Sequence, residues 1–294
     1  MPLTEHNNFI GGEWVPSQEL ATYEIRNPAS KNTIVGRYQS STTEDMNRAI
    51  RAANDALPAW SGMPAPQRSS FLFRALSILE SRADEMARSI TVEEGKPIAD
   101  AMGEVKRAMN IIEYAAGEGR RMFGYTTPSE LPNTIAYTVR RPLGVVAIIT
   151  PWNFPSAMIT RKAGAALAAG CTMVVRPANE TPFSALALAV LAEEAGLPDG
   201  VFSIVTGDAI EISCTLCDSE TVRKISFTGS TEVGRILLEQ SASSVKKMSM
   251  ELGGHAPFLA FDDCDIDKAV KGAIGAKFAT TGQDCLAVNR LYVH

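Results

Sequence analysis

Three polar residues stand in sequence contexts that suit nucleophilic and acid–base chemistry. Cys285 follows a glycine and two polar residues, a context typical of an exposed loop, where a thiol that only fills a core is less expected. Glu251 ends an apolar segment and precedes two glycines, and Asn153 lies in an aromatic turn between two prolines. A thiolate can form a thioester, a carboxylate can activate water, and an amide N–H can stabilise an oxyanion. Taken singly, the glutamate can be a solvated side chain and the asparagine a turn-stabilising one.

The other cysteines indicate neither disulfides nor a metal site. The chain has five cysteines at irregular spacing, and an odd number argues against a disulfide framework. Cys214 and Cys217 form a single C-x-x-C motif late in an expected helix, without the two further ligands that zinc would need. We therefore expect two packed thiols there, and no metal in the protein.

A candidate nucleotide-binding turn follows one of the expected strands. Residues 227–234 predict a strand, a turn at Gly229 and a helix beginning at Thr231. Glycine allows close approach of a ligand, and a helix N-terminus presents unpaired N–H groups to a pyrophosphate. Ser230 has the simpler interpretation of a helix cap. The dinucleotide fingerprint G-x-G-x-x-G is absent from the chain, so a nucleotide site must use another loop.

These residues are positioned by a predicted alternation of strands and helices. Residues 43 to about 118 have helical periodicity, and residues 125–142 predict a projecting hairpin that contains a strand at 134–139. Strands and helices then alternate, which predicts a parallel, doubly wound α/β sheet with its ligand site beyond the carboxyl ends of the strands. The expected strands are 145–149, 173–175, 201–205, 224–227 and 248–252, and the expected helices between and after them are 158–169, 184–194 and 231–240.

Composition excludes several classes of protein. The net charge of −5 gives no basic surface for nucleic acid, and 45% hydrophobic residues are typical of a soluble globular protein. The longest apolar stretch, 163–175, is shorter than the roughly 20 residues of a membrane helix. The N-terminus lacks the basic start and apolar core of a secretory signal. We expect a soluble, cytoplasmic protein without membrane or nucleic-acid partners.

Four motifs occur together in one order, and together they resemble the aldehyde dehydrogenase superfamily. The resemblance runs from about residue 8 to the last residue and is closest to succinate-semialdehyde dehydrogenases. The segments 158–164 and 182–189 carry that closer match. The four motifs are Pro151-Trp152-Asn153-Phe154-Pro155, Phe227-Thr228-Gly229-Ser230, Glu251-Leu252-Gly253-Gly254 and Gly282-Gln283-Asp284-Cys285.

The resemblance implies a role for each motif. Cys285 attacks an aldehyde, Asn153 and the Cys285 backbone N–H stabilise the oxyanion, and Glu251 activates the water that hydrolyses the thioester. It also implies NADP or NAD as cofactor, an aldehyde such as succinate semialdehyde as substrate, bound by Arg161, and a homo-oligomer to which the 125–142 hairpin contributes. The implied cofactor-binding residues are Thr150, Trp152, Asn153, Arg176, Ala178, Asn179, Gly229, Ser230 and Leu252.

The chain departs from the family pattern at two functional positions. Asn179 stands where NAD-preferring members have a glutamate that holds the ribose hydroxyls, and Arg176 can pair with a 2′-phosphate, so the pair favours NADP or dual use. Ala279 stands where succinate-semialdehyde enzymes have a second carboxylate-binding arginine, which leaves Arg161 as the one expected contact.

By resemblance, the chain comprises a cofactor domain and the start of a catalytic domain. We place the NAD(P)-binding domain at 1–252 and an N-terminal portion of the catalytic domain at 253–294, and we expect the strand at 290–293 to lack neighbours. Three alternative functions stay open: oxidation of another aldehyde, transfer of the acyl group to coenzyme A, and a truncated, non-catalytic remnant that binds nucleotide or pairs with full-length subunits. Glu251 favours water over coenzyme A.

Overall fold

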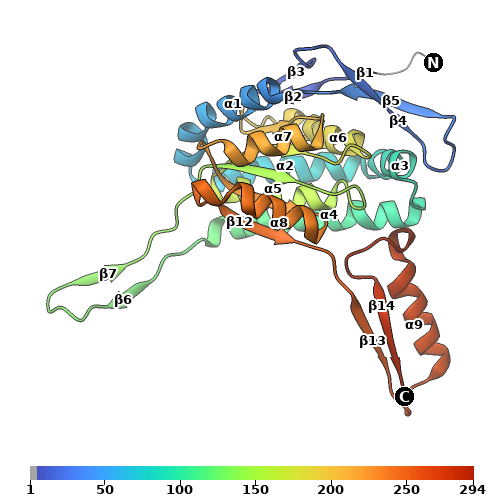
Figure 1. Cartoon of the computed structure of the whole chain (residues 1–294). Helices are drawn as coiled ribbons and strands as arrows, with labels where there is room; N and C mark the ends of the chain where they lie inside the picture. The colour runs from blue at the N-terminus through green and yellow to red at the C-terminus, as the bar shows by residue number, and fades with distance from the viewer. Residues whose placement is uncertain (1–4) are drawn as a thin grey trace.

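The computed structural model describes residues 5–294, and its centre is a seven-stranded sheet (Figure 1). Five strands are parallel, in the order β12-β11-β8-β9-β10, and β2 and β3 extend the sheet in antiparallel register. The strands are β2 (Asn8–Ile10), β3 (Glu13–Val15), β8 (Val145–Ile149), β9 (Thr172–Arg176), β10 (Phe202–Ile204), β11 (Val222–Thr228) and β12 (Lys247–Glu251).

Helices cover both faces of the parallel strands, which explains why β8 and β9 are apolar throughout. Alternate residues of β8 enter different cores: Val146 and Ile148 pack in one, and Val145, Ala147 and Ile149 pack in the other. The first core contains residues of α2 to α6, and the second contains residues of α1, α7 and α8. The predicted doubly wound α/β arrangement is therefore confirmed for the five parallel strands.

The predicted helices begin and end within a few residues of their predicted positions. The helical region that was predicted over 43–118 consists of four helices, and the helix at 231–240 begins and ends as predicted. The helices are α1 (Thr43–Gly62), α2 (Ala65–Ser81), α3 (Ala83–Glu94), α4 (Ile98–Glu118), α5 (Ala157–Ala169), α6 (Pro182–Glu194), α7 (Ala209–Asp218), α8 (Thr231–Gln240) and α9 (Ile266–Phe278). Within residues 5–294, no helix is both long and apolar enough to cross a membrane.

Residues 5–39 form strands that the sequence analysis did not predict. Besides β2 and β3, a three-stranded sheet joins β1 (Glu5–His6), β5 (Ile34–Gln39) and β4 (Thr22–Arg26) beside the main body (Figure 1). Because β2 pairs with β10 in antiparallel register, the central sheet is mixed and not wholly parallel. The two antiparallel strands are additions to one edge of the predicted parallel sheet.

Two further segments extend from the body of the molecule (Figure 1). The predicted hairpin is present as β6 (Thr126–Pro128) paired with β7 (Ile135–Tyr137), and it projects from the body. The second segment is an arm of β13 (Ala256–Ala260), α9 and β14 (Val288–Val293). The expectation that the strand at 290–293 lacks neighbours is wrong, because β14 pairs in parallel with β13, a strand that the sequence analysis did not predict.

Candidate active site

The carboxyl ends of three adjacent strands bring the predicted site residues to one edge of the sheet. Strand β11 lies between β8 and β12, and its Thr228 is in register with Glu251 of β12. The Gly229 N–H donates to the carbonyl oxygen of Glu251 over 3.1 Å. The loop that follows β8 carries Asn153. Segments that are about 100 residues apart in sequence therefore meet at this edge, as the switch-point rule for open α/β sheets predicts.

The loop that carries Cys285 lies against the loop that carries Asn153. The Asn153 Nδ2 donates a hydrogen bond of 2.7 Å to the carbonyl oxygen of Gln283, two residues before the cysteine. Gly254 approaches Cys285 so closely that a Cβ at position 254 would lie 2.8 Å from the Cys285 carbonyl oxygen. This close approach explains the second glycine after Glu251 and brings the cysteine, the amide and the glutamate together.

The electrostatic environment of Cys285 disfavours its thiolate in this state of the site. Burial raises the pKa of the thiol, and the charges of Asp284 and Glu251 raise it further. Thiols are reactive as thiolates, so attack requires a group that removes the proton. Glu251 is exposed at the end of β12, and its carboxylate has no hydrogen bond or ion pair with another side chain within residues 5–294, so it is open to water.

Lys162 is a site residue that the sequence analysis missed. It lies on α5 beside Arg161, and burial lowers the pKa of its ammonium to about 8, whereas the charge of Glu251 opposes that shift. The mutual charge effect places the Lys162 ammonium near the Glu251 carboxylate. Its position in the second turn of a helix that begins directly after the Asn153 loop was the available signal.

The fit of a nucleotide can be tested by the buried polar groups that have no partner. Thr150, Arg176 and Thr228 follow or end the adjacent strands β8, β9 and β11. The Thr150 Oγ1, Arg176 Nε and Thr228 Oγ1 atoms are buried and have no hydrogen-bond partner among residues 5–294. Buried polar groups are normally paired, so three unpaired groups at one sheet edge suit a polar ligand. These residues therefore fit a nucleotide cofactor.

The turn after β11 has the predicted geometry, and its serine is a helix cap. Ser230 caps α8, because its hydroxyl accepts from the Val233 N–H over 3.2 Å. At Gly229, a Cβ would lie 2.4 Å from the ring of Phe227, so a side chain would displace that ring. Leu252 packs against Gly234 of α8, which aligns the helix N-terminus with the end of β12.

The predicted cofactor segment after β9 is internally bonded. Arg176 and Ala178 are buried, and the Arg176 Nη2 donates to the Asn179 side-chain oxygen. Burial lowers the pKa of the Arg176 guanidinium. Trp152 is half-buried in the loop after β8. The asparagine thus orients an arginine that still has an unpaired Nε atom.

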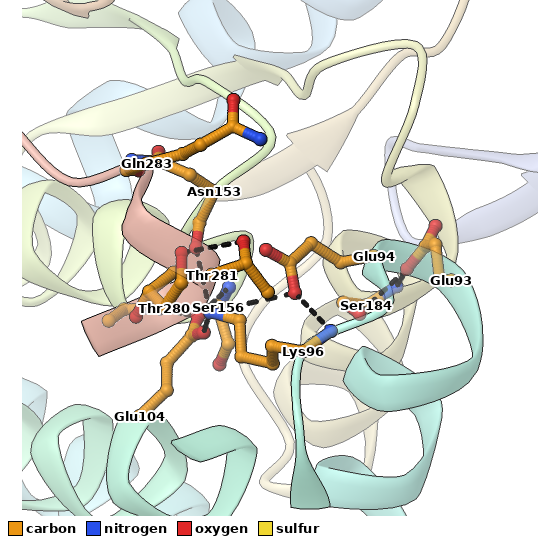
Figure 2. A network of polar contacts seen from close by, with 11 residues as sticks. Glu93, Glu94, Lys96, Glu104, Asn153, Ser156, Ser184, Thr280, Thr281 and Gln283 are labelled. Carbon is orange, nitrogen blue, oxygen red and sulfur yellow. Dashed lines mark hydrogen bonds and ion pairs between the residues drawn. The ribbon is translucent and has the colours of Figure 1, made fainter. Parts of the chain in front are cut away.

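A buried charge network supports the loop that carries Asn153 (Figure 2). Lys96 is fully buried, and its Nζ donates to the Glu104 Oε2 and to the Asn153 carbonyl oxygen, each over 2.7 Å. The Glu104 Oε1 accepts from the backbone N–H groups of Ser156 and Ala157, at the start of α5. One lysine–glutamate pair therefore fixes the middle of the loop and its junction with α5. The sequence analysis took Lys96 only as part of a helix-ending segment and missed Glu104.

A second buried glutamate, Glu93, binds the start of α6 in a similar way. Glu93 accepts from the backbone N–H groups of Phe183 and Ser184 at the start of α6, and also from the Ser184 hydroxyl. Burial raises the pKa of Glu93 to about 8. Burial also raises the pKa of Glu94 to about 7, although the charge of Lys96 opposes that shift. The Oε2 of Glu94 lies 3.9 Å from the Lys96 Nζ.

The other residues that the sequence analysis discussed lie on helices or directly after them, not at the ends of the central strands. Arg161 is exposed on α5, and Ala279 follows the C-terminus of α9. The two cysteines of the C-x-x-C motif lie late in α7 as predicted, with Cys217 buried and Cys214 half-buried, and both are free thiols. Among residues 5–294 no cluster of three or more potential metal ligands was found.

Comparison with known proteins gives consistent results. The aldehyde dehydrogenase family model matches residues 14–294. The chain is 50% identical to a glutarate-semialdehyde dehydrogenase of Pseudomonas putida over 99% of its own length and 60% of that protein. It is 49% identical to the NADP(+) succinate-semialdehyde dehydrogenase GabD of Escherichia coli, over 100% of the chain and 62% of that protein. The solved structure of a succinate-semialdehyde dehydrogenase from Burkholderia pseudomallei superimposes with a TM-score of 0.97 at 48% identity, over 98% of this chain and 60% of that one. The chain thus spans about 60% of the length of these relatives.

Proposed function

The chain belongs to the aldehyde dehydrogenase family, and we propose that the protein oxidises an aldehyde to a carboxylic acid with NADP or NAD. One observation supports this most strongly: the Cys285 loop, the Asn153 amide and the Glu251 carboxylate meet at the carboxyl edge of a doubly wound sheet. A thiol, an oxyanion donor and a base are the three groups that oxidation through a thioester requires.

Each residue has a defined task in the proposed reaction. The Cys285 thiol gives its proton to the Glu251 carboxylate, which passes it to solvent, and the sulfur adds to the aldehyde carbon, which turns the carbonyl oxygen into an oxyanion. An N–H of the Asn153 amide and the Cys285 backbone N–H stabilise that oxyanion. A bound nicotinamide would supply the hydride acceptor, and loss of the hydride from the same carbon would leave a thioester on Cys285. Glu251 takes a proton from water, which attacks the thioester and releases the acid and the thiol.

Cofactor binding is proposed at the sheet edge that has the unpaired polar groups. Thr150, Trp152 and Asn153 follow β8, and Arg176 ends β9, with Ala178 and Asn179 after it. Gly229 and Ser230 precede α8, and Leu252 follows β12. Asn179 adds no negative charge, and Arg176 is a cation at the same site, so a 2′-phosphate meets attraction and no repulsion. We therefore expect NADP to be used at least as well as NAD.

Semialdehydes are the proposed substrate class. The relatives described above are named for glutarate and succinate semialdehydes, whose far end is a carboxylate. Arg161 lies about one turn after the start of α5, the helix that follows the Asn153 loop, and a guanidinium there suits a short anionic substrate. We also propose that the protein assembles as a homo-oligomer through the β6–β7 hairpin, whose Ile135 and Tyr137 side chains are exposed.

Two substitutions separate the proposed roles. Cys285→Ala should abolish formation of the reduced cofactor, whereas Glu251→Gln should allow one turnover and leave an acylated Cys285 that mass spectrometry detects. The matched control is Cys264→Ala, because Cys264 is also a half-buried free thiol and lies outside the site. Normal activity of Cys285→Ala with succinate semialdehyde would contradict the nucleophile assignment, and rapid deacylation in Glu251→Gln would contradict the base.

A further inference from the structure

A cavity between α4 and α5 contains two arginines from different helices. Its volume is about 510 Å³, and Arg107 of α4 and Arg161 of α5 both line it. The rest of the lining includes Tyr114, Met122 and small side chains of both helices. Arg161 was predicted from the sequence as a carboxylate-binding residue, but Arg107 was not predicted as part of any site.

The packing of the two helices places these arginines at the same level. Glu104 of α4 contacts the start of α5 at Ser156 and Ala157, and further along the pair Gly164 packs on Ala115. The helices therefore run in the same direction, side by side. Arg107 comes three residues after Glu104, and Arg161 comes four residues after Ala157. At 1.5 Å per residue, each arginine lies about 5 Å beyond the shared contact.

The positive charge of these two arginines is not neutralised by nearby carboxylates. Among residues 5–294, no carboxylate oxygen lies within 4.0 Å of either guanidinium. Glu118 also lines the cavity, but its Oε1 is bonded to Arg121 over 2.8 Å. Two like charges that share a cavity repel one another, and an anion between them relieves that repulsion.

The two arginines lie at the end of the cavity nearer the Asn153 loop. Arg161 is near the start of α5, the helix that follows this loop, and Glu104, three residues before Arg107, contacts the start of the same helix. An aldehyde whose carbonyl lies near Cys285 can therefore extend an anionic end toward Arg161. A carboxylate suits two guanidiniums, because each of its oxygens accepts paired N–H groups in one plane.

We infer that Arg107 is a specificity-determining residue that binds the terminal carboxylate of the aldehyde together with Arg161. This inference rests on the proposed oxidation of semialdehydes and adds a second cation to the substrate site. Ala279 supplies no charge, and Arg107 supplies it instead from α4. The substrate class is an aldehyde with one carboxylate at its far end.

The test combines equilibrium binding with turnover in Arg107→Gln. Binding of succinate and glutarate, which mimic the product end but do not react, is measured by calorimetry. We expect Arg107→Gln to weaken both about ten- to hundredfold, the effect of losing one hydrogen bond to a charged group. The same variant should lower kcat/KM for succinate semialdehyde by a similar factor and should lower kcat/KM for butanal much less. Arg107→Lys keeps the charge but loses the planar guanidinium. Its affinity for the dicarboxylates should lie between those of the unmodified protein and Arg107→Gln.

Lys106→Gln is the matched control. It removes the same charge from the adjacent exposed position of α4, but Lys106 does not line the cavity. Equal binding of the dicarboxylates by Arg107→Gln and Lys106→Gln, or no binding by the unmodified protein, overturns the inference. If the unmodified protein binds dicarboxylates through Arg107 but oxidises neither aldehyde, the proposed function fails and the anion site stands.

Discussion

Replacement of Lys96 by methionine should destabilise the fold far more than removal of an exposed lysine. The Lys96 Nζ lies 2.7 Å from the Glu104 Oε2, 3.9 Å from the Glu94 Oε2 and 4.4 Å from the centre of the Phe154 ring. The side chains of all three charged residues are fully buried. Methionine fills a similar volume but leaves two carboxylates without their cation, and the Asn153 carbonyl loses its donor.

The expected loss of unfolding free energy is about 3 kcal/mol. Removal of one partner of a buried ion pair costs about 3–5 kcal/mol, because the remaining charge is unpaired in an apolar environment. We expect a loss near the lower end of this range because of Glu94. Its pKa is already raised to about 7, so it becomes neutral at little cost when Lys96 is absent. The Glu104 Oε1 keeps its two backbone donors, but its Oε2 loses the Lys96 ammonium, so most of the expected loss arises at Glu104.

The measurement is urea denaturation at pH 7, followed by circular dichroism. Lys268→Met is the control, because it removes a lysine from an exposed pair with Asp265 at 3.2 Å, and exposed pairs contribute little. Adding Glu104→Gln to Lys96→Met should recover part of the loss, since the neutral amide can still accept from Ser156 and Ala157. The reasoning is refuted if Lys96→Met and Lys268→Met have the same unfolding midpoint, or if the double substitution is less stable than Lys96→Met alone.

Two further predictions concern pH and the cofactor. Burial raises the pKa of Glu94 from 4.5 to about 7, so its stabilising contribution is complete below pH 4.5 and is lost as the pH rises through about 7. Glu94→Gln should therefore equal the unmodified protein at pH 4.5 and be more stable at pH 8 in urea denaturation. A lower stability of that variant at pH 8 would show that the ionised carboxylate is favourable. Asn179→Glu should lower kcat/KM for NADP at least tenfold relative to NAD, because a carboxylate would face the 2′-phosphate and also pair with Arg176. An unchanged ratio would place the phosphate elsewhere.

The parts of the fold that were predicted correctly have strong local signals. The apolar run Val145–Ile149 is a strand buried on both faces, and Ser230 caps the helix that was predicted after Gly229. Residues 5–39 gave no such signal. Strand β2 is short and includes Asn8, a polar residue that is buried because it bonds to Ser41 and Thr206. Those partners are far away in sequence, so no local pattern predicts the strand.

The same distinction holds in the candidate site. Cys285, Glu251 and Asn153 were identified because each occurs within a motif, and the structure brings their segments together. Lys96 and Glu104 have no motif, and a charged residue is expected to be exposed unless it is paired. They are buried where the N-terminal end of α4 packs against the Asn153 loop and the start of α5, which lie more than 50 residues away in sequence, so composition and periodicity could not indicate this burial.

Two buried glutamates bind the N-termini of α5 and α6, but only the one at α5 is paired with Lys96. Glu93 and Glu104 each accept from two backbone N–H groups at a helix N-terminus, where the helix dipole favours a negative charge. Glu93 adds a hydroxyl donor from Ser184, and the structure gives it no cation partner within residues 5–294. Glu104 instead adds Lys96, whose remaining hydrogen bond goes to the Asn153 carbonyl oxygen. Glu93 therefore positions only the start of α6. Glu104 positions the start of α5 and, through Lys96, also Asn153, the residue proposed to stabilise the oxyanion. A shift of α4 relative to α5 would move that amide relative to Cys285, so the position of the proposed oxyanion donor depends on the packing of these two helices.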